Sequence, residues 1–254
     1  MDDCGSDLTC DRFLDGRLKV WQPRKGYRAG VDPVILAAAT PAHAEQRVLE
    51  LGCGVGVASL CLAARVPRLA LTGIEVQPDY ADLARRNARD NGVAFEVHTA
   101  DLRRLPDELR RQSFDHVILN PPYFLAHHRI PASDAGRENA LAGETPLSEW
   151  IATATRRLKP KGHLTIILAA ARLPALLAAC DDRVGSIAMI PLSARPGRRA
   201  DLIVFRARKG GRAAFCLCPP VVMHNGAAHR GEGDSYSPEM RAVLRRGASL
   251  RPVD

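Results

Sequence analysis

The stretch Phe114-Asp115-His116-Val117-Ile118-Leu119-Asn120-Pro121-Pro122-Tyr123 joins an apolar run to an abrupt stop. The run predicts a buried strand, and the prolines end it because proline donates no N–H and cannot continue into a helix. Proline also keeps the preceding residue extended, which places Asn120 at the end of the strand. In open α/β sheets, ligands bind outside the carboxyl ends of the strands. An amide, a rigid prolyl pair and an aromatic ring therefore predict a recognition site for a planar polar group.

From residue 47 onward, strand and helix patterns alternate, which predicts a doubly wound, mostly parallel α/β sheet of seven strands. The last two strands follow each other without a helical crossover, so we expect the last strand to be antiparallel. The expected strands are 48–51, 69–75, 95–99, 114–120, 164–168, 184–190 and 201–206, and the expected helices are 57–64, 78–91, 147–158 and 169–179.

We divide the chain into an N-terminal extension (1–46), a core (47–212) and a basic C-terminal extension (213–254) of the same domain. The first part is expected to contain a hairpin over 13–21 with a two-residue turn at Asp15-Gly16. A helix over 32–39 follows, with Asp32 as N-cap and Pro33 at the first helical position. Residues 124–145 show no periodic pattern. A long loop beside the expected site is typical of a segment that grips the substrate.

Composition narrows the class of protein. The chain has 254 residues, of which 46% are hydrophobic, and its longest apolar segment is interrupted by Arg172 and Pro174, so we expect no membrane span. The N-terminus carries Asp2, Asp3 and Asp7 and lacks a signal-peptide pattern, which predicts a cytoplasmic protein. The seven cysteines have no zinc-site spacing, so we expect no metal.

A second motif, Leu49-Glu50-Leu51-Gly52-Cys53-Gly54-Val55-Gly56, predicts a strand, a glycine-rich turn and a helix. Such a turn lets the backbone approach a ligand, and the helix N-terminus offers free N–H groups. A dinucleotide fingerprint would need glycine where this chain has Val57. The spacing G-x-G-x-G is instead typical of doubly wound methyltransferases that use S-adenosylmethionine. A tight turn without a ligand is the structural alternative.

Acidic residues follow the next two expected strands. Glu75 ends one of them, where a carboxylate can accept both hydroxyls of a ribose. Asp101 and Leu102 follow the other strand, where the carboxylate can accept from an adenine amino group while Leu102 packs on the ring. Three successive strand ends therefore predict a nucleoside-containing cofactor.

The chain resembles class I methyltransferases of the N6-adenine type, in which Asn-Pro-Pro-Tyr is the catalytic signature. More closely, it is similar to the bacterial family that methylates N6 of adenosine 37 in a valine tRNA. The similarity extends from Phe13 almost to Leu250, and segments 26–32, 195–197 and 206–211 carry it beside the signature.

The resemblance implies S-adenosyl-L-methionine as the cofactor and adenine as the methyl acceptor. It implies that the Asn120 side-chain oxygen and the Pro121 carbonyl accept the two N–H bonds of the exocyclic amine, while Pro122 keeps the turn rigid and Tyr123 stacks on the base. The implied cofactor-binding residues are Arg28, Gly30, Asp32, Gly52, Cys53, Gly54, Gly56, Glu75, Val76, Asp101, Leu102 and Asn120.

Charge is concentrated near the C-terminus. Residues 191–254 contain twelve Lys/Arg and five Asp/Glu, whereas the first 190 residues contain 24 and 23. This distribution is typical of nucleic-acid binding, although a solubilising surface would look the same. The resemblance implies a tRNA substrate that is methylated in its anticodon loop, and loops present the unstacked bases that such a site needs. The expected RNA-binding residues are Arg195, Arg198, Arg199, Arg206, Arg208, Lys209 and Arg212.

Three other functions share these features. The same signature occurs in glutamine-N5 methyltransferases for release factors and in guanine-N2 methyltransferases for ribosomal RNA. The glutamine enzymes usually carry a separate N-terminal helical domain, whereas here only about forty residues precede the first core strand. A non-catalytic RNA-binding protein on this fold would be favoured by a broken signature, but every expected position is filled.

Overall fold

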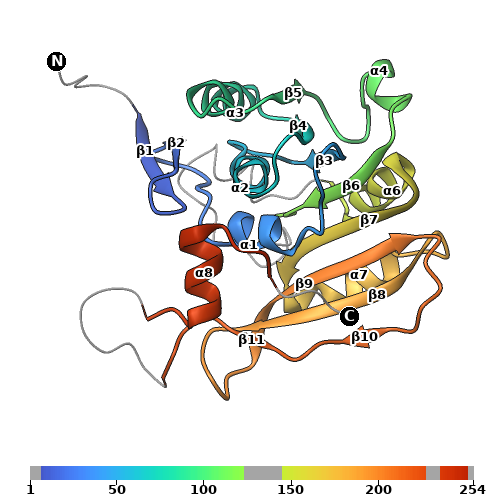
Figure 1. Cartoon of the computed structure of the whole chain (residues 1–254). Coiled ribbons are helices and arrows are strands. Elements are labelled where there is room, and N and C mark those ends of the chain that lie inside the picture. Colours follow the sequence, from blue (N-terminus) through green and yellow to red (C-terminus); the bar gives the residue numbers. More distant parts are fainter. Residues whose placement is uncertain (1–6, 123–144, 227–234, 251–254) are drawn as a thin grey trace.

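A mixed β-sheet forms the centre of the computed structural model, which describes residues 7–122, 145–226 and 235–250 (Figure 1). Its strands are β3 (Arg47–Leu51), β4 (Ala70–Glu75), β5 (Phe95–Thr99), β6 (Phe114–Leu119), β7 (Leu158–Ala169), β8 (Val184–Ser193), β9 (Ala200–Lys209), β10 (Cys216–Leu217) and β11 (Val221–Val222). A separate hairpin contains β1 (Leu8–Phe13) and β2 (Leu18–Pro23). The helices are α1 (Asp32–Ala39), α2 (Val57–Arg65), α3 (Pro78–Asp90), α4 (Asp107–Arg110), α6 (Leu147–Arg157), α7 (Leu173–Ala179) and α8 (Pro238–Arg246).

The strand order is β10-β8-β9-β7-β6-β3-β4-β5, with β11 also paired to β8. The five strands β3 to β7 run parallel, and the chain order reverses between β3 and β6. This reversal is the switch point at which doubly wound sheets bind ligands. Strand β9 is antiparallel to both of its neighbours, β7 and β8, which confirms the expected antiparallel last strand.

Two apolar layers bury the sheet. Alternate residues of the strands pack on α1, α2, α3 and α8 on one face and on α4, α6 and α7 on the other. Because both faces are covered, β6 ends in three consecutive buried apolar residues, Val117-Ile118-Leu119, rather than alternating with polar residues. All carboxyl ends of β3 to β7 therefore meet at one edge of the sheet.

All seven expected core strands are present, and five expectations need correction. The expected helix over 169–179 begins only at Leu173, because β7 extends to Ala169 and a 3-10 turn occupies residues 170–172. Strand β7 starts at Leu158 rather than at 164, because the sheet accommodates Pro160 and Gly162 beside a register shift. The hairpin loop has four residues, since Phe13 pairs with Leu18. Val31, not Asp32, is the N-cap of α1, and no side chain caps it. The two-residue strands β10 and β11 extend the expected seven-stranded sheet at its edge.

His116 is buried at the opposite end of β6 from the prolines. Its ring stacks on that of His163 with centroids 5.5 Å apart, and its Nε2 bonds to Gln46 Oε1 at 2.8 Å. Its Nδ1 is buried without a partner among the described residues. Burial, followed by the positive charges of His163, His43 and Arg206, lowers the pKa of His116 to about 4, against an opposing effect of Asp115.

This lowered pKa predicts acid sensitivity. The unfolded chain binds the His116 proton near pH 6.5, whereas the folded chain binds it only near pH 4. The stability contribution is therefore complete above pH 6.5 and is lost as the pH falls towards 4, by about 3 kcal/mol of unfolding free energy. Urea unfolding between pH 7 and pH 4.5 would measure this loss. His116→Gln should flatten the profile, and a slope equal to that of the wild type would contradict the prediction.

Candidate active site

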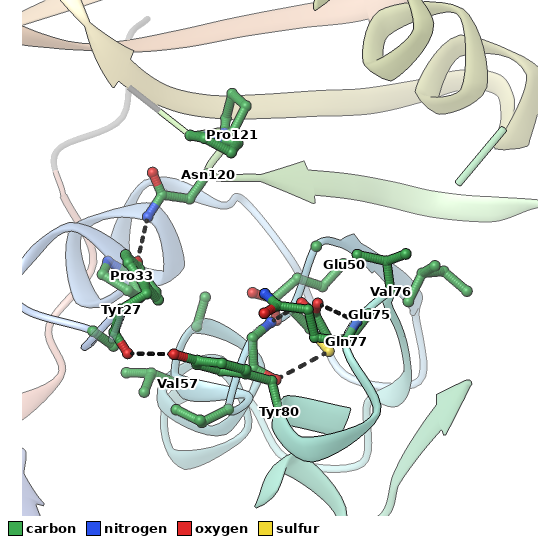
Figure 2. A pocket seen from close by; sticks show the side chains of 18 of the residues that line it. Tyr27, Pro33, Glu50, Val57, Glu75, Val76, Gln77, Tyr80, Asn120 and Pro121 are labelled. Atoms are coloured by element: carbon green, nitrogen blue, oxygen red, sulfur yellow. Dashed lines mark hydrogen bonds between the residues drawn. The ribbon is translucent and has the colours of Figure 1, made fainter. Parts of the chain in front are cut away.

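A cavity of about 810 Å³ opens at the carboxyl edge of the sheet, where the ends of β3, β4 and β6 meet the loop before α1 (Figure 2). It brings together nearly all the residues expected to bind a cofactor or to act in catalysis. Those that line it are Arg28, Gly30, Asp32, Gly52, Cys53, Gly54, Glu75, Val76, Asp101, Leu102, Asn120, Pro121 and Pro122. Tyr123 and the expected gripping loop, apart from Thr145, lie outside the described residues.

The glycine turn is built for close packing on one side and ligand approach on the other. A side chain at Gly52 would meet the ring of Trp150 at 2.6 Å, whereas Gly54 faces the cavity. Gly56 does not line the cavity. It has a φ of +89°, and a side chain there would press on Phe95 at 3.1 Å, so it serves the packing of α2 on the sheet rather than ligand contact.

Glu75 holds the glycine turn in place. Its Oε2 accepts from Gly54 N and its Oε1 from Gln77 N, both at 2.9 Å. Each carboxylate oxygen has a further lone pair for a hydroxyl. Burial raises the pKa of Glu75, and the backbone hydrogen bonds oppose this rise. The neighbouring Val76 is 61% exposed and lines the cavity, so it offers an apolar surface on which a ring can pack.

Glu50 is a second acid in the wall of the cavity. It belongs to β3, is 4% exposed, and accepts from the backbone N and hydroxyl of Ser59 at 3.1 and 2.5 Å. Burial raises the pKa of Glu50 to about 8. A cationic group in the cavity would stabilise its charged form, because an opposite charge nearby favours ionisation.

The two arginines at the cavity are already engaged. Arg103 bonds to Asp101, with Nη2 and Oδ2 2.7 Å apart, and this contact lowers the pKa of Asp101. Arg28 donates to the hydroxyl of Thr9, to the Pro23 carbonyl and to Asp11. Its guanidinium therefore ties the loop before α1 to the hairpin. The wall also contains Asp32, Glu50 and Glu75, and this excess of acidic groups suits a ligand that carries positive charge.

Asn120 lies across the cavity from Glu50 and Glu75 (Figure 2). Its Nδ2 donates to the hydroxyl of Tyr27 at 3.5 Å, and the hydroxyl of Tyr80 donates to the Tyr27 carbonyl at 3.1 Å. The Asn120 Oδ1 is buried and accepts no hydrogen bond within the described part of the chain. Buried polar atoms are normally paired, so this oxygen is an acceptor available to a substrate N–H.

The expected RNA-binding cations do not form one surface. Antiparallel β9 starts at the cavity edge and runs away from it, with Leu202 opposite Ala169 and Arg208 opposite His163. Six residues of strand separate these pairs, or about 20 Å. Arg195, Arg198 and Arg199 therefore lie towards the cavity edge, and Arg206, Arg208, Lys209 and Arg212 lie towards the other edge.

Several of these cations also have structural contacts. Lys209 donates to the carbonyls of Thr155 and Leu158 at the end of α6, both at 2.7 Å. Arg195 donates to the carbonyls of Asn225 and Gly226. Arg206 is partly buried, which lowers its pKa. The seven cations are close together in sequence but are spread along the sheet, because the direction of β9 separates them. Their role in RNA binding stays a prediction.

The residues of the cavity wall that sequence reasoning missed include Tyr27, Glu50, Tyr80 and Trp150. Glu50 was detectable as an acid inside an apolar strand. The other three come from the loop before α1, from α3 and from α6, and no local pattern links them to the glycine turn. Among the described residues, no group of three or more His, Cys, Asp or Glu is arranged to hold a metal, and no helix is both long and apolar enough to span a membrane.

Comparisons with known proteins agree with this geometry. The methyltransferase small domain model matches residues 30–180. A tRNA1(Val) (adenine(37)-N6)-methyltransferase from Porphyromonas gingivalis is 33% identical over 65% of this chain and 68% of its own length. One from Aeromonas hydrophila is 26% identical over 84% of this chain and 89% of its own length.

Solved structures share the fold. A crystal structure from Agrobacterium tumefaciens, described as a predicted O-methyltransferase, has a TM-score of 0.71 and 27% identity, and covers 87% of this chain and all of its own. The 16S rRNA N2 G1207 methyltransferase of Thermus thermophilus, in complex with AdoMet and guanosine, has a TM-score of 0.53 and 17% identity, covering 80% of this chain and 50% of its own.

The fold is that of class I methyltransferases, and the cofactor is S-adenosylmethionine. The cavity fits this cofactor, because its carboxylates suit a cationic ligand and Gly54 leaves the turn open. The family model matches more than half of the chain, and a curated relative is 33% identical over 68% of its own length. The chain therefore belongs to the methyltransferase small-domain family and to the bacterial tRNA1(Val) (adenine(37)-N6)-methyltransferase family.

Proposed function

We propose that this enzyme acts in the cytoplasm and methylates the exocyclic N6 of an adenine in tRNA, at adenosine 37 of the anticodon loop. The observation that carries the proposal is Asn120 Oδ1, which lies beside Pro121 at the cavity edge and is buried with no partner among the residues described. An amine with two N–H bonds supplies the hydrogen-bond donor that this acceptor lacks. The curated relatives named for this reaction support adenine in tRNA over the other planar amines.

Different groups of the cavity would bind the cofactor and orient the target amine. Glu75 would accept from the ribose of the cofactor, Val76 and Leu102 would pack on its adenine, and Glu50 would face its charged portion. S-Adenosylmethionine supplies an already activated methyl group, so the task left to the protein is alignment. Asn120 Oδ1 and the Pro121 carbonyl would accept the two N–H bonds of the target amine and point its nitrogen into the cavity, while Tyr123 would stack on the base.

The target base must leave its stack to reach the cavity, which a tRNA loop permits more readily than a duplex. Arg198 and Arg199 are exposed and near the carboxyl edge of the sheet, so we propose that they contact the phosphate backbone beside the target nucleotide. Arg199 also pairs with Asp201, with Nε and Oδ1 3.1 Å apart.

The function is tested by incubating the enzyme and labelled S-adenosylmethionine with purified tRNA, ribosomal RNA and release factor in parallel. We expect label in tRNA, recovered as N6-methyladenosine after nuclease digestion. The Asn120→Ala protein is the matched control for contaminating activity. Methylglutamine from the release factor, or N2-methylguanosine from ribosomal RNA, with tRNA unlabelled would overturn the assignment.

The division of the cations along β9 predicts unequal effects of two matched double variants. The double variant Arg198→Ala, Arg199→Ala should have a higher KM for tRNA. Its binding should also depend less on salt: the slope of log binding constant against log salt concentration should become shallower by about 0.7 to 0.9 for each phosphate that is no longer neutralised. Arg208→Ala with Arg212→Ala removes the same charge at the far edge and should leave both quantities near wild type. Filter binding between 50 and 300 mM salt distinguishes them, and equal slopes would show that the near-edge arginines do not bind the phosphates.

A further inference from the structure

Arg172 lies beside the Asn-Pro-Pro turn, although 50 residues separate it from Pro122 in sequence. It ends η2 (Ala170–Arg172), a one-turn 3-10 helix that follows β7. Because β7 is the parallel neighbour of β6, both strands deliver the segments that follow them to the same edge of the sheet. There, Arg172 Nη1 donates a hydrogen bond to the carbonyl oxygen of Pro122.

The turn needs such an anchor for a chemical reason. Neither Pro121 nor Pro122 has an N–H, so the backbone of the prolyl pair can form hydrogen bonds only through its carbonyl oxygens. The pyrrolidine rings already restrict φ of both residues, and a donor on the Pro122 carbonyl restricts the rotation that remains. The Pro121 carbonyl and the Asn120 amide are thereby kept in a defined relation to the cavity.

We infer that Arg172 is a positioning residue for methyl transfer, which acts by holding the Pro121-Pro122 turn. The inference rests on the proposed role of that turn as the acceptor of the target amine. A guanidinium suits the task because it presents several N–H donors in a planar fork, whereas a lysine offers a single point charge on a flexible stem. Arg172 Nε is also buried without a partner among the described residues.

The test compares Arg172→Met and Arg172→Lys in single-turnover methyl transfer at saturating cofactor. The acceptor is whichever fraction the wild type labels, so an error in the RNA assignment leaves the test intact. We expect Arg172→Met to slow transfer on the order of ten- to a hundredfold, since small misplacements of reacting groups have effects of that size. Arg172→Lys should recover only part of the rate. Arg183→Met, which removes an exposed arginine paired with Asp181, is the matched control and should match wild type.

Cofactor affinity by calorimetry, the melting temperature and the KM for the acceptor should stay close to wild type in Arg172→Met. The double variant with Asn120→Ala should be nearly as fast as Asn120→Ala alone, because both residues act through one turn. If the effects of Arg172→Met and Asn120→Ala on the transfer rate multiply in the double variant, Arg172 contacts the acceptor directly. The same holds if Arg172→Met changes only the KM for the acceptor. A wild-type rate in Arg172→Met would also overturn the inference. So would a slower rate in Arg172→Met and Arg172→Lys that is accompanied by weaker cofactor binding and a lower melting temperature in both.

Discussion

Asn120→Ala should reduce the rate of methyl transfer on the order of a hundredfold or more, which is the largest effect we expect from a single substitution. The change removes one positioned acceptor at the atom where charge develops during the reaction, and losses of this size follow from removing a single such group. The wild-type Oδ1 has no competing partner among the described residues. Its full hydrogen-bonding capacity is therefore available to the substrate.

Single-turnover transfer to tRNA, together with calorimetric titration of the cofactor, measures this effect. Cofactor affinity should change little, because Glu75, the expected ribose ligand, lies across the cavity from Asn120. Tyr27→Phe removes only the hydroxyl that accepts from Asn120 Nδ2 at 3.5 Å, so we expect a loss of severalfold at most. A wild-type rate in Asn120→Ala would exclude the proposed role of the amide.

Glu75→Ala should weaken S-adenosylmethionine binding about ten- to a hundredfold. A hydrogen bond to a charged group contributes about 1.5 to 3 kcal/mol, and one such bond to a ribose hydroxyl accounts for a loss of this size. The substitution also releases the N–H groups of Gly54 and Gln77, both held at 2.9 Å by the carboxylate. The glycine turn should therefore loosen as well, and the upper end of the range is expected.

Calorimetric titration of the cofactor is the direct measurement for this variant. Asp79→Ala is the matched control, because it removes an exposed carboxylate from the first turn of α3 without touching the cavity. Its affinity should equal that of the wild type. Should Glu75→Ala bind as tightly as Asp79→Ala, Glu75 would have no contact with the cofactor.

The sequence by itself determined the features that depend on neighbours along the chain. The Asn-Pro-Pro stretch predicts the end of β6, and the glycine turn predicts the junction of β3 and α2, because proline and glycine act on the backbone within one or two residues. Alternation of strands and helices was sufficient to predict the parallel sheet and the edge at which its strands end. The residues expected at those strand ends therefore came together in one cavity.

The tertiary structure alone decided which distant residues complete the cavity and which charges lie near it. Tyr27 reaches Asn120 across 93 residues, and Arg172 reaches Pro122 because β7 happens to pair with β6. The basic stretch near residue 200 looked continuous in sequence, but antiparallel pairing carries Arg208 away from the edge where Arg199 lies. The physical reason is that strand order and direction are set by packing over the whole sheet, whereas a sequence motif records only the conformation of its own few residues.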